Sequence, residues 1–130
     1  MRNIKKEIAR CMSDLETAED LALTARFVFP DDFIGFHGHF PGNKILPGIC
    51  QIQCAIAMLE RWKKRRVVVK EIVLAKFLAP VFPSEELTCV CRDITDTDDI
   101  FVLKASFSKS GQKVAELKLK VAFDQEIKEE

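Results

Sequence analysis

Alternating apolar residues mark the first element that the chain predicts. From Leu21 to Phe29 every second residue is apolar, and Pro30 ends the pattern. A period of two places these side chains on one face of a β-strand, and that face is expected to be buried. The residues before it, 1–15, mix charged and apolar side chains, which predicts a short helix or a loose N-terminal arm.

A second segment, from Ile49 to about Trp62, is apolar almost all round. A helix without a polar face is expected to be enclosed by other structure. Pro47 and Gly48 precede it, and proline is favoured at the first position of a helix. Basic residues follow its last apolar positions and suit the negative end of the helix dipole. The sequence therefore predicts one long buried helix.

The rest of the chain predicts β-structure. Four further segments are rich in β-branched residues or alternate in polarity, and Ser110-Gly111 predicts a turn between the last two. Consecutive strands with short connections favour an antiparallel sheet. We expect a single α+β domain, residues 1–130, in which this sheet wraps around one buried helix. The four segments are Val67–Phe77, Leu87–Cys91, Phe101–Phe107 and Ala115–Phe123.

The charge balance narrows the partners that the chain is expected to have. Lysine plus arginine (20) equals aspartate plus glutamate (20), so no net charge selects nucleic acid or a membrane surface. The longest nearly uncharged stretch, Ile45 to Leu59, is too short to span a bilayer. The N-terminus lacks the apolar segment of a signal peptide. We expect a cytoplasmic protein that binds neither nucleic acid nor membrane.

Five cysteines raise the question of a disulfide or metal site. Their odd number and irregular spacing argue against a disulfide framework. Cys50 and Cys54 would share one face of the predicted helix, a spacing that could suit a metal. No C-x-x-C or H-x-x-x-H pattern supports a zinc site, so small buried apolar residues are the favoured interpretation. No metal and no cofactor is expected.

The loop before the predicted helix carries the candidate chemistry. It holds His37 and His39 and leads directly to the helix start at Gly48. The first N–H groups of a helix have no partner within the helix, so they can hold a carbonyl oxygen that becomes negative. A nearby histidine could take or give a proton near neutral pH, and together these groups would enolise a thioester. A structural loop with a satisfied histidine is the alternative.

The loop sequence G-H-F-P-G-x-x-x-L-P-G-I, residues 38–49, resembles the signature of the β-hydroxyacyl-acyl-carrier-protein dehydratases of fatty-acid synthesis. A second stretch, Ala75 to Pro83, resembles their K-F-x-x-P-V-x-P segment. The resemblance covers roughly residues 20–123. It implies a hotdog fold, in which two subunits pair their sheets side by side and build active sites at the interface. It also implies an acyl-carrier-protein or coenzyme A thioester as substrate and a homodimer or a higher oligomer of dimers.

The resemblance also implies a role for each motif residue. His39 corresponds to the base that removes the α-proton of a (3R)-hydroxyacyl thioester, and Gly48 corresponds to the glycine whose N–H holds the thioester carbonyl. The position of the family's catalytic acid, which protonates the departing hydroxyl from the other subunit, is occupied by Gln53. The remaining motif residues that would contact the substrate are Phe40, Pro41, Gly42, Pro47 and Ile49.

Gln53 is the departure from the family pattern. An amide can hydrogen-bond a hydroxyl but has no acidic proton to give at neutral pH. General acid catalysis contributes about 10²–10⁴-fold, or roughly 3–5 kcal/mol of barrier. Glu60 lies about 10 Å farther along the helix and does not obviously substitute. Dehydration is therefore expected to be weak or absent while the binding geometry survives.

Two further features have more than one interpretation. His37 is an exposed loop residue or a substitute proton donor. The basic run at residues 63–66 is a solvated helix end or a docking site for an acidic acyl carrier protein. Nucleic acid is disfavoured, because aromatic interleaving and an overall basic balance are missing.

Three functions are compatible with these residues. The leading hypothesis is a 3-hydroxyacyl thioester dehydratase, a hydro-lyase. The second is an acyl thioesterase on the same fold, with Gln53 positioning rather than protonating. The third is a non-catalytic hotdog subunit that binds acyl thioesters, which the missing acid favours.

Overall fold

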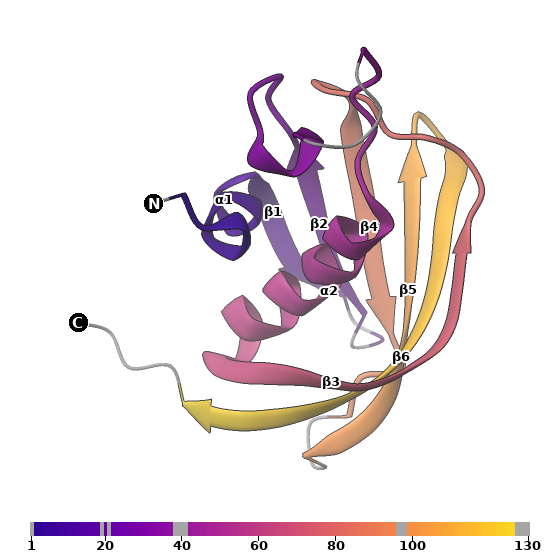
Figure 1. Ribbon diagram of the computed structural model, residues 1–130. Helices are drawn as coiled ribbons and strands as arrows, with labels where there is room; N and C mark the ends of the chain where they lie inside the picture. The colour runs from indigo at the N-terminus through magenta and orange to yellow at the C-terminus, as the bar shows by residue number, and fades with distance from the viewer. Residues whose placement is uncertain (1, 19, 21, 38–41, 96–98, 127–130) are drawn as a thin grey trace.

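The computed structural model describes residues 2–18, 20, 22–37, 42–95 and 99–126, with the backbone alone for 125 and 126. It shows a curved antiparallel sheet folded around one helix, as expected from the sequence (Figure 1). The strands lie side by side in the order β1-β2-β4-β5-β6-β3. They are β1 (Met12–Thr17), β2 (Leu23–Val28), β3 (Arg65–Phe77), β4 (Glu86–Arg92), β5 (Ile100–Lys109) and β6 (Gln112–Glu126).

Helix α2 (Gly48–Lys63) crosses the concave face of this sheet (Figure 1). The prediction of a long enclosed helix is confirmed, since nine of its sixteen residues are buried. Lys64 follows its last residue, with a left-handed φ of 55° and an amide that donates to the Glu60 carbonyl at 2.8 Å. The Glu60 carboxylate accepts a hydrogen bond from the Val67 amide at 3.0 Å, which ties the helix end to β3.

The N-terminal region combines a confirmed prediction with a missed strand. Helix α1 (Ile4–Arg10) decides between the two alternatives for this region in favour of a short helix, and the Asn3 side chain caps it by accepting from the Lys6 amide. Strand β1 follows at Met12, where we expected no strand. Only Met12 of this strand is fully buried, so its sequence lacks the apolar alternation that reveals β2. A bulge between Ser13 and Glu16 disturbs it further.

The β5–β6 hairpin confirms the predicted turn. Ser110 and Gly111 connect Lys109 to its partner Gln112, with φ values of 47° and 78°. Positive φ at both central positions matches the right-handed twist of the flanking strands, and glycine adopts it without steric cost. The hairpin is thereby fixed in register.

Burial decides between the two interpretations of the helix cysteines. Cys50 and Cys54 are 1% and 0% exposed, and burial raises the pKa of the Cys50 thiol to about 11 and that of Cys54 well above its usual value. The interpretation as small buried apolar residues is confirmed. Among the described residues, no three histidine, cysteine, aspartate or glutamate side chains lie together as metal ligands would. None of the described helices has the length and hydropathy needed to cross a bilayer.

Candidate functional site

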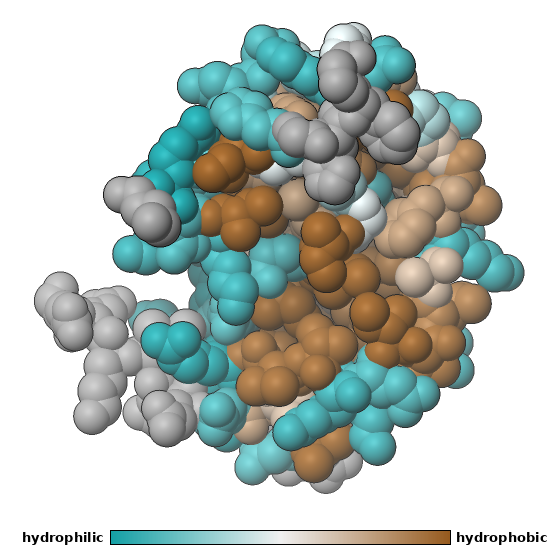
Figure 2. Space-filling model, viewed as in Figure 1, coloured by the Kyte–Doolittle hydropathy of each residue, from teal (hydrophilic) through white to brown (hydrophobic). Residues whose placement is uncertain are grey.

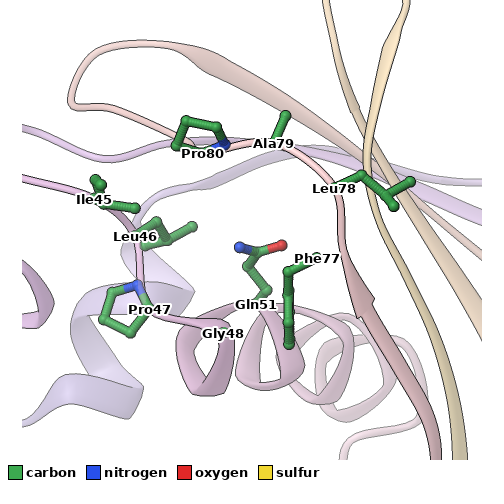
Figure 3. A pocket seen from close by; sticks show the side chains of 9 residues that line it. All are labelled: Ile45, Leu46, Pro47, Gly48, Gln51, Phe77, Leu78, Ala79 and Pro80. Carbon is green, nitrogen blue, oxygen red and sulfur yellow. The ribbon is translucent and has the colours of Figure 1, made fainter.

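A cleft of about 400 Å³ opens where α2 begins (Figure 3). One wall is the loop that leads into the helix, and the opposite wall is the segment that follows β3. All but one of the side chains around it are apolar. The lining residues are Ile45, Leu46, Pro47, Gly48, Gln51, Phe77, Leu78, Ala79 and Pro80.

The two sequence motifs that carry the family resemblance meet at this cleft. The Leu46 amide donates to the Val81 carbonyl at 2.8 Å, which joins the loop motif to the second motif. The Leu78 amide donates to the Val114 carbonyl at 2.7 Å and fixes the second motif against β6. Two segments far apart in the sequence therefore form one site.

The first turn of α2 supplies unpaired donors at the cleft. Pro47 precedes the helix and has no side-chain cap, while its carbonyl accepts from the amides of Cys50 (3.0 Å) and Gln51 (3.3 Å). Within the part of the chain that the structure describes, the amides of Gly48 and Ile49 have no acceptor. Such N–H groups carry the positive end of the helix dipole and can hold an oxygen that becomes negative.

Gly48 also allows Phe77 to form the cleft wall. A Cβ atom at position 48 would lie 2.6 Å from Phe77 Cζ, so a larger residue would displace this ring. Phe77 is itself 48% exposed and lies directly beside the helix start (Figure 3). The absence of a side chain at Gly48 thus keeps the helix amides and an aromatic wall together.

The other predicted site residues are distributed as follows. His39, Phe40 and Pro41 lie outside the described residues. Gly42 is exposed with a left-handed φ of 89°. Ile49 is 67% exposed and does not line the cleft, although Pro47 and Gly48 do.

His37 is an exposed residue at the end of the short 3₁₀ helix η1 (Ile34–Phe36). Its amide donates to the Ile34 carbonyl at 3.0 Å. His37 is thus exposed, and its role as a substitute proton donor stays a prediction.

Gln53 lies on a different face of α2 from the cleft. It is partly buried in a groove between α1 and the second half of α2. Gly48 and Gln53 of one chain therefore do not face the same cavity. The groove is rich in cations, and its charged residues are Lys5, Lys6, Glu60, Arg61, Lys64 and Arg66.

The structure adds Gln51, which the sequence did not single out. It lies one helical turn after Gly48, and its side chain rises from α2 into the cleft (Figure 3). At 3% exposure it is the one buried polar or charged side chain among the described residues. Its Oε1 atom has no hydrogen-bond partner. A polar residue three positions after the helix start, inside an apolar helix, was the available signal.

The basic run after α2 is only partly a free surface. Arg65 pairs with Asp99 at 3.0 Å, donates to the Asp124 carbonyl and lies 5.2 Å over the Phe123 ring. Lys64 and Arg66 are exposed and border the groove beside Gln53. The two interpretations, a solvated helix end and a docking site, thus both remain predictions for these two residues.

Solved structures with this fold include dehydratases and thioesterases. A chain of the dehydratase heterocomplex ApeI:P from Xenorhabdus doucetiae superposes with a TM-score of 0.73 at 19% identity, covering 85% of this chain and 96% of that one. A hypothetical thioesterase with coenzyme A from Streptococcus pneumoniae gives 0.66 at 8% identity, covering 96% and 97%. At these identities the likeness establishes the hotdog fold and nothing further.

Sequence relatives point to the dehydratases. The chain is 34% identical over 89 residues to a 3-hydroxyacyl-[acyl-carrier-protein] dehydratase FabZ of Brucella abortus, covering 62% of this chain and 57% of that protein. It is 29% identical over 91 residues to FabZ of Clostridium beijerinckii, covering 65% and 64%. The chain thus matches less than two thirds of the length of these curated relatives. The family model described as ApeI-like, ApeI dehydratase, matches residues 15–121. The chain belongs to the ApeI-like dehydratase family, within the hotdog-fold dehydratases.

Proposed function

We propose that this protein eliminates water from (3R)-3-hydroxyacyl thioesters carried by acyl carrier protein or coenzyme A, without a cofactor. The observation that carries the proposal is the free amide of Gly48 at the head of an apolar cleft. This donor suits a thioester oxygen, and the apolar walls suit an acyl chain. Membership of a dehydratase family selects this chemistry among those that an oxyanion site could support.

The reaction assigns one task to each group. His39 removes the proton from C2 of the substrate, and the Gly48 amide stabilises the negative charge that develops on the thioester oxygen. The electron pair then forms the C2–C3 double bond as the C3–O bond breaks. The departing hydroxide takes up a proton from solvent and leaves as water, and the protonated His39 returns its proton to solvent. Gln53 of the partner subunit holds the hydroxyl by a hydrogen bond and supplies no proton, which makes the last step slow.

Turnover by the wild-type chain tests the proposal. Purified protein is expected to convert 3-hydroxyacyl thioesters to 2-enoyl thioesters, followed by absorbance of the conjugated product, on acyl carrier protein or coenzyme A. Several chain lengths are needed, because the described cleft residues do not fix one. Absence of turnover above background with every substrate refutes the activity. Release of free thiol without enoyl product supports the thioesterase hypothesis instead.

We also propose that the active protein is a dimer joined along β3. This strand is one edge of the sheet, because among the described strands it pairs with β6 alone. Its later residues are exposed on both faces of the strand, unlike the inner strands. Long, apolar open edges favour pairing with another strand, and Figure 2 shows apolar side chains gathered on this face of the molecule. The large apolar residues at this edge are Val68, Ile72, Val73, Leu74, Phe77 and Leu78, each 38–57% exposed.

Charges on this edge are expected to separate the subunits. The double substitution Ile72→Lys and Leu74→Lys brings like charges of the two subunits close together in a two-fold pairing along β3, so the dimer is expected to dissociate at about micromolar concentration. Sedimentation velocity measures the mass, and the turnover assay is expected to lose activity in parallel. Val102→Lys is the matched control, since Val102 is exposed on the internal strand β5. An unchanged dimer in the double variant contradicts this interface.

A further inference from the structure

The feature that the proposed reaction leaves unexplained is the buried amide of Gln51. Its neighbours among the buried residues of α2 are apolar or cysteine. Burying a polar group without a partner is unfavourable, so native proteins rarely keep one without a reason. An apolar residue of similar size would fill the same space without that cost.

The walls of the cleft offer Gln51 few donors, because most of their amides are already used. The Leu46 amide donates to the Val81 carbonyl. Those of Leu78 and Ala79 both donate to the Val114 carbonyl, at 2.7 and 3.3 Å. Pro47 and Pro80 have no N–H to give. Apart from the free Gly48 amide, which the proposed reaction assigns to the thioester oxygen, the described cleft walls offer the Gln51 oxygen few backbone donors.

We infer that the Gln51 side chain binds a hydrogen-bond donor of the ligand, close to the thioester that the Gly48 amide holds. The inference rests on the proposed function, because it takes the ligand to be an acyl thioester. Three residues along an α-helix rise about 4.5 Å and return to nearly the same face, so Gln51 reaches a group a few bonds from the carbonyl. Gln51 is a specificity residue in this scheme and takes no proton.

Two groups of an acyl thioester carry such a donor. The 3-hydroxyl lies on the acyl side of the carbonyl, and the first amide N–H of pantetheine lies on the carrier side. Either group would donate a hydrogen bond to Gln51 Oε1. Saturated acyl thioesters have no 3-hydroxyl and so offer only the amide. A site that hydrogen-bonds a ligand donor rejects the analogue that lacks it, because the protein acceptor is then left unpaired.

Binding of four matched ligands separates the two donors. They are the 3-hydroxyoctanoyl and octanoyl thioesters of N-acetylcysteamine, which has the pantetheine-like amide, and of propanethiol, which lacks it. Titration calorimetry uses the full chain with His39→Ala, so that no ligand turns over. The Gln51→Met change, which keeps the side-chain length, is compared in that background with Gln112→Met, an exposed glutamine that does not line the cleft.

The expected result is that one donor increases affinity about 5- to 30-fold with Gln51 present and has no effect in the Gln51→Met variant. A preference for the hydroxyl places Gln51 on the acyl side, and a preference for the amide places it on the carrier side. Equal affinities for all four ligands, or no binding at all, overturn the inference. So does an equal loss in the Gln112→Met control.

Thermal unfolding without ligand provides a second readout. Removal of the unpartnered buried acceptor is expected to raise the Tm of the Gln51→Met chain without ligand. The further rise in Tm that a ligand causes is expected to be smaller in this variant than in the chain that keeps Gln51. Gln51→Leu takes the place of Gln51→Met if that variant does not fold. Because these experiments measure binding, they can fail while turnover succeeds, and the turnover assay can fail while Gln51 still recognises a donor.

Discussion

The His39→Ala variant is expected to lose dehydration by about 10²–10⁴-fold, to or near the background rate. The Gly48 amide would still hold the thioester carbonyl, but no group would take the C2 proton. Binding of substrate is therefore expected to change little while kcat falls. Steady-state turnover of a 3-hydroxyacyl thioester, together with titration of the variant with the same ligand, measures the two effects separately.

His37→Ala is the matched control for this experiment. His37 lies two residues earlier in the same loop and is exposed. Its hydrogen bond to the Ile34 carbonyl uses the backbone amide, which alanine retains. Activity close to that of the wild type is expected. Full activity in His39→Ala combined with a loss in His37→Ala would transfer the role of base to His37.

The elements that the sequence predicted are those whose pattern is local. The apolar alternation around Phe27 and the continuous apolar run of α2 each identify a buried face without knowledge of the rest of the chain. Strand β1 was missed because it is held by pairing with β2 and buries little of its own surface. Pairing with a neighbour leaves no periodic trace in the strand's own sequence.

In the candidate site, too, some features follow from the neighbouring sequence and others depend on packing against distant parts of the chain. Gly48 could be singled out from the sequence because a helix start exposes its amides wherever it lies, and in the structure it lines the cleft. Gln51 and Gln53 stand two positions apart and so point about 200° apart around the helix axis. Which of them faces the cleft depends on how α2 is rotated against the sheet. That rotation is set by packing with distant strands, so the sequence pattern alone could not separate the two glutamines.

The substitution Gln53→Glu is expected to raise dehydration by about 10²-fold, the lower end of the range for general acid catalysis. The carboxyl would restore the proton donor that the departing hydroxide needs. The groove around position 53 holds five cations and one carboxylate, Glu60, so the net field lowers the pKa of a carboxyl placed there. The protonated fraction is then small near neutral pH.

The lowered pKa of the carboxyl in the Gln53→Glu variant determines how its activity depends on pH. A general acid works only while protonated, so the advantage of the Gln53→Glu variant over the wild type is expected to be largest at low pH. It declines as pH rises through the lowered pKa of the carboxyl. The ratio of the two rates, measured from about pH 5 to 8, isolates this contribution from the titration of the base.

Gln53→Met provides the control, because it keeps the side-chain length and has no proton to give. It is expected to be no faster than the wild type. An equal rise in both variants would mean that removal of the amide, rather than restored acid catalysis, increases the rate. An inactive wild type with an active Gln53→Glu variant would identify the natural protein as a subunit that binds acyl thioesters in a competent geometry. Because the base and the oxyanion donors would then already be in place, the acid at position 53 alone would separate binding from catalysis.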